Sequence, residues 1–176
     1  MEKLKELEKA GELKIYYADG SAMSMEPSCP YAWQKRGERL EIPCFKGKTL
    51  NLFGLWDAKK DLQLYSSENT LDSEMVIAYI DDFLKNKEAP LAIVIDNAPI
   101  HTSKLFINKQ LEWEAAGFEI FNLPTYSPKL NLIEHLWRFM KYEWIEFSAY
   151  DCWNNLVNYV EKIAVNFGIE YTINFV

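Results

Sequence analysis

The chain contains few of the residues on which disulfide-rich and disordered proteins depend. Its 176 residues include only 3 cysteines, 7 glycines and 7 prolines, while 49% are hydrophobic. The cysteines, Cys29, Cys44 and Cys152, are odd in number and lack the spacing of zinc ligands. A disulfide framework and a structural zinc site are therefore both disfavoured, and the composition is that of a globular protein.

Long hydrophobic runs are also missing. No stretch approaches the about 18 apolar residues that a transmembrane helix needs. The first residues, Met1 to Lys9, are mostly charged and do not resemble a secretory signal. These absences, together with the unpaired cysteines, favour a reduced, cytoplasmic protein with no membrane association, and the length favours one domain.

Positive charge is in the minority, because the formal net charge is −7. This argues against an isolated high-affinity DNA-binding module, which is usually basic. The charge is uneven, however: residues 29–60 carry a net +4, and residues 61–90 a net −5. The basic segment is a candidate contact for a phosphate backbone, and the alternative is ordinary solvated surface charge.

The hydrophobic pattern predicts alternating strands and helices. We expect strands at 13–18, 49–56, 62–66, 91–95 and 118–123, and helices at 2–10, 72–87, 103–116, 128–147 and 151–167. The unbroken apolar run 91–95 is typical of a strand covered on both faces. Three antiparallel strands followed by alternating helices and strands predict an α/β fold of the RNase H-like type, with a central mixed sheet of about five strands flanked by helices.

Three acidic residues stand where such a fold gathers its ligands. Asp19 and Asp96 each follow an apolar strand, and Glu134 lies one to two turns into a helix that Ser127 and Pro128 are suited to begin. Two Mg²⁺ ions about 3.5–4 Å apart can activate a water and stabilise a leaving oxygen in phosphoryl transfer. Mg²⁺ prefers carboxylate oxygens, so these residues are candidate metal ligands.

Each candidate also has an ordinary structural interpretation. An aspartate after a strand is often a turn or cap residue, and the sequence from Asp96 to Pro99 is a common turn signal. Glu134 and Arg138 have the spacing of a helix salt bridge. His101 is equally compatible with a loop. The combination, rather than any single residue, favours a catalytic site.

Two sequence blocks carry a family resemblance. They read Asp-Asn-Ala-Pro-Ile-His at 96–101 and Leu-Pro-Thr-Tyr-Ser-Pro-Lys-Leu-Asn-Leu-Ile-Glu at 123–134, with 37 residues between Asp96 and Glu134. The chain thereby resembles the DDE transposases of the mariner superfamily, most closely the bacterial insertion-sequence branch. The segments 33–37 and 50–54 resemble the second-strand region of the same family.

The resemblance implies an RNase H-like catalytic domain that uses two Mg²⁺ or Mn²⁺ ions to cut transposon ends and join them to target DNA. Asp19, Asp96 and Glu134 match the catalytic and metal-binding positions, and Asn97, His101 and Asn131 match supporting motif positions. We expect DNA contacts from five basic residues: Lys35, Arg36, Lys46, Lys48 and Lys129. A protein with this function would be associated with the bacterial nucleoid.

The sequence departs from the family pattern in two places. Gly20 follows Asp19 where the family often has glutamate, and Leu132 replaces a common proline, but neither change removes a ligand. We expect residues 1–11 to be a linker helix and 12–176 the catalytic domain, with the family's N-terminal helix-turn-helix region absent. A homodimer and a separately encoded or fused helix-turn-helix region are the further expected partners.

Two alternative functions stay open at this stage. One is another RNase H-like nuclease, which acts on RNA–DNA hybrids or Holliday junctions. The other is a non-enzymatic or inactive transposase remnant that folds but lacks its DNA-recognition region. Without that region, DNA binding by this chain is expected to be weak, salt-sensitive and indifferent to sequence.

Overall fold

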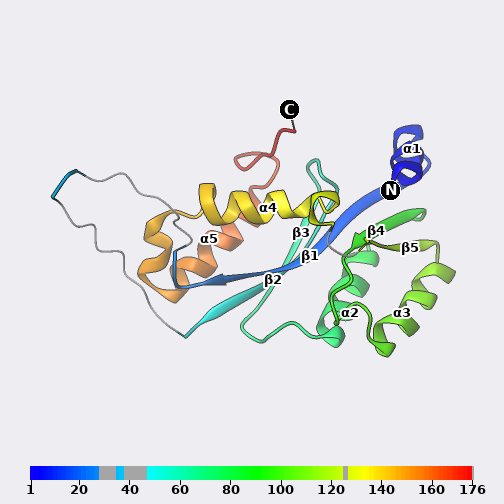
Figure 1. The fold of residues 1–176 in the computed structure, drawn as a ribbon, viewed down its shortest axis with the longest axis horizontal. Coiled ribbons are helices and arrows are strands. Elements are labelled where there is room, and N and C mark those ends of the chain that lie inside the picture. The colour runs from blue at the N-terminus through cyan, green and yellow to red at the C-terminus, as the bar shows by residue number, and fades with distance from the viewer. Residues whose placement is uncertain (28–34, 38–46, 125–126, 176) are drawn as a thin grey trace.

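A mixed five-stranded sheet forms the centre of the protein (Figure 1). The computed structural model describes residues 1–27, 35–37, 47–124 and 127–175. The strands are β1 (Lys14–Ser24), β2 (Thr49–Trp56), β3 (Leu62–Ser67), β4 (Leu91–Ile95) and β5 (Phe118–Asn122). Their order across the sheet is β3-β2-β1-β4-β5, with the first three antiparallel and β1, β4 and β5 parallel. The predicted fold class is confirmed.

Helices cover both faces of this sheet. The α-helices are α1 (Glu2–Ala10), α2 (Ser73–Leu84), α3 (Lys104–Ala115), α4 (Ile133–Phe139) and α5 (Trp153–Val165). Alternate residues of β1 point to opposite faces, as the period of a strand requires. Tyr16 and Ala18 join a core with α2 and α3, whereas Ile15 and Tyr17 join a second core with α4 and α5. Figure 1 shows the two helical layers on either side of the strands.

Local capping signals correctly predict where two helices begin. The side chain of Asp72 accepts a hydrogen bond from the Met75 amide at 2.8 Å, and that of Ser103 accepts one from the Phe106 amide at 3.2 Å. Such caps satisfy amides that have no partner within the helix. The predicted helix at 2–10 is confirmed as α1, and its role as a linker stays a prediction.

The predicted helix at 128–147 is not continuous. The structure has a 3₁₀ turn at Pro128–Leu130, then α4, then a π-helical turn at Met140–Trp144. The π turn arises because the Ile145 amide bonds the Met140 carbonyl, five residues earlier, at 3.2 Å. Glu134 is therefore the second residue of a short helix rather than a residue one to two turns inside a long one.

One further boundary differs from the expectation. The first strand does not end at residue 18 but runs to Ser24, because it pairs with β2 from Tyr17 onward, so Asp19 lies within it. Near the C-terminus, Phe167 and Tyr171 form an isolated β-bridge. Among the helices that the structure describes, none has the length and hydrophobicity needed to cross a membrane.

Gly54 on β2 allows α4 to approach the sheet closely. It pairs with Asp19 across the β1–β2 ladder. A Cβ atom at Gly54 would lie 2.9 Å from Ile133 Cδ1 and 2.9 Å from Trp137 Cη2, both on α4. These distances are shorter than van der Waals contact. The absence of a side chain at Gly54 therefore sets how near the helix carrying Glu134 lies to the strand carrying Asp19.

We expect Gly54→Ala to destabilise the protein by about 1–3 kcal/mol, because overpacking forces well-packed side chains to shift. Urea unfolding followed by circular dichroism measures this change. Gly20→Ala is the matched control, since its Cβ would meet only the flexible Leu71 Cδ1 closely, at 3.1 Å. Equal stability of the two variants would contradict the assigned role of Gly54.

Candidate active site

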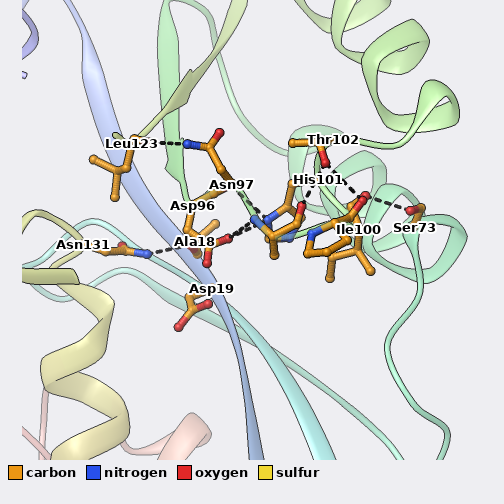
Figure 2. Close-up of polar contacts among 12 residues, drawn as sticks. Ala18, Asp19, Ser73, Asp96, Asn97, Ile100, His101, Thr102, Leu123 and Asn131 are labelled. Atoms are coloured by element: carbon orange, nitrogen blue, oxygen red, sulfur yellow. Dashed lines mark hydrogen bonds and ion pairs between the residues drawn. The ribbon is translucent and has the colours of Figure 1, made fainter. Parts of the chain in front are cut away.

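The pairing of β1 with β4 brings Asp19 and Asp96 together. Tyr17 pairs with Val94, and each aspartate comes two residues later on its own chain segment. Because side chains alternate along strands, both aspartates share the sheet face of Tyr17 and Val94, which α4 covers. Figure 2 shows the two side chains at adjoining chain segments, as the sequence predicted.

Asp19 lies in a largely desolvated position among other negative charges. Its Oδ2 accepts a hydrogen bond from Trp137 Nε1 at 3.0 Å. Burial, and after it the negative charges of Glu134 and Asp96, raise the pKa of Asp19 from its ordinary 3.8 to about 7. The indole and the Gly20 amide act in the opposite direction without cancelling this shift. Glu134 and Asp96 therefore both lie within electrostatic reach of Asp19.

Asp96 has the opposite electrostatic character. His101 Nδ1 lies 2.9 Å from Asp96 Oδ1, and the Ala98 amide donates to the same oxygen at 3.1 Å (Figure 2). The hydrogen bond from His101 is the main reason that the pKa of Asp96 is lowered from its ordinary value. His101 is buried, with 3% of its surface exposed, so it is a fixed part of the site rather than a loop residue in solvent.

The two predicted supporting asparagines bond to the backbone. Asn97 Nδ2 donates to the Leu123 carbonyl, which joins the ends of β4 and β5. Asn131 is 3% exposed, and its Nδ2 donates to the Ala18 carbonyl at 3.1 Å (Figure 2). The second bond ties the segment before α4 to the residue that precedes Asp19. Both asparagines thus position the chain segments that carry the carboxylates.

Glu134 is exposed and faces a shallow pocket. The pocket has a volume of about 250 Å³ and is lined by Lys129, Glu134, His135 and Arg138. Within the described ranges, no ion pair joins Glu134 to Arg138, so the structure gives no support to the salt-bridge interpretation. Lys129 is one of the five predicted DNA-binding residues, whereas Arg138 is not among the predicted site residues. Its position one turn after Glu134 was the available signal.

The structure gives less information about the other predicted DNA-binding residues. Lys35 and Arg36 are exposed, and Lys46 lies outside the described residues. Lys48 is 3.8 Å from Glu68 and its ammonium lies 5.0 Å from the centre of the Trp153 ring. It precedes the first residue of β2, which pairs with Ser24, five residues beyond Asp19. Their role in DNA binding stays a prediction.

The three carboxylates are chemically suitable ligands for a divalent cation, but their side chains are not gathered into a closed site. Their oxygens are the hard ligands that Mg²⁺ and Mn²⁺ prefer. The raised pKa of Asp19 reflects burial first and then the negative charges of Glu134 and Asp96, whose repulsion a cation would relieve. In the described part of the chain, however, no three histidine, cysteine, aspartate or glutamate side chains are arranged closely enough to hold a metal. The residues therefore fit the cation in type, and their side chains would have to converge to bind it.

A comparison with protein families identifies the chain. The family model described as DDE superfamily endonuclease matches residues 14–157. The chain belongs to this family. The match spans every strand of the sheet and all three acidic residues. A search of curated proteins gave no match.

Solved structures show the same fold at low sequence identity. The Mos1 transposase paired-end complex with left transposon end is 18% identical with a TM-score of 0.64, over 93% of this chain and 51% of that one. The catalytic domain of Mos1 mariner transposase is 15% identical with a TM-score of 0.59, over 93% and 76%. The catalytic core domain of BIV integrase is 12% identical with a TM-score of 0.56, over 92% and 87%.

These matches confirm the RNase H-like fold of a transposase or integrase catalytic core. The DDE chain described here spans about half the length of the Mos1 transposase chains in their DNA complexes. The fold and family are therefore established for this chain. The activity and partners of a longer transposase are a matter for proposal.

The raised pKa of Asp19 predicts an unusual dependence of the protein's stability on pH. Because its folded pKa of about 7 lies above the ordinary 3.8, the folded state holds a proton that the unfolded state releases between these values. Stability should then fall as pH rises from about 4 through 7. Asp19→Asn keeps an acceptor for Trp137 and removes the charge, so it should stabilise the metal-free protein by roughly 1–3 kcal/mol near pH 8 and little near pH 4.

Urea unfolding at the two pH values, without divalent metal, tests this. Asp151→Asn is the control, since Asp151 is exposed in a 3₁₀ turn. A loss of stability in Asp19→Asn near pH 8, or an equal change at both pH values, would contradict the expected effect.

Proposed function

We propose that this domain performs metal-dependent DNA cleavage and strand transfer in the transposition of an insertion sequence. The single observation that supports the proposal is that the negative charges of Asp96 and Glu134 both act on the buried Asp19 carboxyl at one face of an RNase H-like sheet. Membership of the DDE endonuclease family supports the same chemistry. Asp19, Asp96 and Glu134 are the proposed metal ligands.

The proposed cofactors are two Mg²⁺ or Mn²⁺ ions. When bound, such ions generate an attacking oxygen nucleophile at neutral pH and stabilise the leaving oxygen. In this chain, His101 would keep Asp96 ionised and oriented, because it already donates to Oδ1. Asn131 would hold the segment that precedes α4 against β1. Lys129 and Arg138, beside Glu134, would attract a phosphate backbone.

DNA is the proposed partner, as transposon ends and as target. Mos1 structures with similar folds contain a left transposon end and a strand transfer complex, and others contain Mn or Mg. By analogy, we propose that this domain acts with a helix-turn-helix region, fused or separately encoded, and as a homodimer. A bacterial transposase of this kind would work at the nucleoid.

Calorimetric titration of Mn²⁺ into the metal-free protein tests the ligand assignment. The wild type should bind, and Asp96→Asn should lose most of the heat because a coordinating charge is removed. Asp151→Asn, an equal change of charge at an exposed aspartate, should bind as the wild type does. Equal heats from wild type and Asp96→Asn would exclude Asp96 as a ligand.

A plasmid-nicking assay with Mn²⁺ tests the activity. The wild type should nick supercoiled DNA, while Asp19→Asn, Asp96→Asn and Glu134→Gln should each fall to background. Glu143→Gln is the matched control, because Glu143 is exposed in the π-helical turn after α4. A wild type that binds Mn²⁺ but cleaves nothing would indicate an inactive remnant. Faster cleavage of an RNA–DNA hybrid would favour another RNase H-like nuclease.

Lys129 should contribute to non-specific DNA binding. Lys129→Ala should weaken binding to unrelated duplexes to a similar degree and lower the magnitude of the salt slope by about 1, because one phosphate contact is lost. Fluorescence anisotropy at several salt concentrations measures both effects. Lys3→Ala on α1 is the control, and an equal response of the two variants would refute a specific role for Lys129.

A further inference from the structure

An indole on α4 contacts the most buried carboxylate of the site. Trp137 is 3% exposed, and its Nε1 donates to Asp19 Oδ2 at 3.0 Å. An indole N–H can only donate a hydrogen bond, so its partner must be an acceptor such as a carboxylate oxygen. The bond spans from the helix of Glu134 to the central strand of the sheet, between residues 118 positions apart in sequence.

The sheet is shaped to receive this ring. Gly54 pairs with Asp19, and its missing side chain leaves the space that the Trp137 ring occupies, since an added Cβ would lie 2.9 Å from Cη2 and 3.2 Å from Cζ2. The indole is therefore packed against the strand pair at the level of Asp19. A side chain locked by packing in this way can hold a hydrogen-bonded partner in one orientation.

The contact leaves part of the carboxylate available. Trp137 donates one hydrogen bond to Oδ2 and the Gly20 amide donates another to this carboxylate, so further lone pairs of its oxygens stay open to a cation without displacing the indole. Trp137 also lies one helical turn after Glu134, which makes the positions of two proposed ligands depend on the same two-turn helix. Donors to ligating carboxylates commonly fix ligand orientation in metal sites.

We propose that Trp137, seated over Gly54, is a positioning residue that orients the Asp19 carboxylate for divalent metal binding. The proposal rests on the proposed function, because it takes Asp19 as a metal ligand. Trp137 does not itself contact the metal. It acts through one N–H group, and that property separates it from a residue that only fills the core.

The sharpest test removes the N–H and keeps the ring. Trp137→benzothienylalanine replaces the indole N–H by sulfur, with almost unchanged shape. Calorimetry of Mn²⁺ binding should show an affinity lower by about tenfold or more. Trp137→Phe, which also removes the N–H, should show at least the same loss.

A second indole–carboxylate pair in this chain supplies the control. Trp113 Nε1 donates to Asp81 Oδ1 at 2.8 Å between α3 and α2, on the other face of the sheet. Trp113→benzothienylalanine loses an equivalent bond, so it controls for a general effect on folding. It should bind Mn²⁺ as the wild type does, and melting curves should show similar small losses in stability for both variants.

The indole contact can also be observed without metal or activity. In a ¹⁵N–¹H spectrum of the metal-free protein, the Trp137 Nε1 signal, assigned by its absence in Trp137→Phe, should shift in Asp19→Ala, which removes the acceptor. The Trp113 signal should stay in place. No shift of the Trp137 signal would mean that the bond does not form in solution and would overturn the proposal.

The outcomes separate the two claims. If the wild type binds Mn²⁺ and Trp137→benzothienylalanine binds equally well, the positioning role fails while the proposed function stands. An equal loss in the Trp113 control would also overturn the role, since the effect would be general. If the wild type binds no Mn²⁺, the proposed function and the positioning role fail together, while the indole spectrum still reports whether the contact exists.

Discussion

The parallel pairing of β1 with β4 is the constraint on which the rest of the site depends. It sets Tyr17 level with Val94 and thereby brings two aspartates from distant parts of the chain to one sheet face. Carboxylates in such a position repel one another, and the surrounding groups shift their pKa values in opposite directions. Asp96 is stabilised as an anion by His101, whereas Asp19 is left with a raised pKa in a largely desolvated position. The asymmetry follows from burial at Asp19, which lies within β1, and from the His101 hydrogen bond at Asp96, which follows the end of β4.

The third acidic residue depends on packing rather than on strand pairing. Glu134 is carried by α4, and α4 contacts the sheet through the indole of Trp137 and the space over Gly54, while Asn131 fastens the preceding segment to the Ala18 carbonyl. Each of these contacts involves β1 or its neighbour β2 close to Asp19. The position of α4 is thus fixed by contacts with the same few residues of the central strands that also position the aspartates.

Much of this arrangement could be predicted from sequence because it has local causes. The apolar run at 91–95 indicates a buried strand, and Asp72 and Ser103 cap helices through their own side chains. The acidic residues were found by combining strand ends with two motif blocks. Gly54 and Trp137 were missed as site residues, since their roles exist only once α4 lies against the sheet, whereas the spacing of Arg138 from Glu134 was visible in the sequence. The break-up of 128–147 also has a local cause, a π turn that hydrophobic spacing does not reveal.

The small size of α4 has a consequence for the folding of the protein. A helix of seven residues is too short to persist in water by itself. Its stability comes from the packing of Ile133, Leu136 and Trp137 against the sheet, so a partial opening that separates α4 from the sheet would take the reactive centre apart. The sheet and the layer formed by α2 and α3 would survive such an opening. Catalytic competence and global foldedness are therefore separable properties in this chain, and amide hydrogen exchange along α4 is a direct measure of the first.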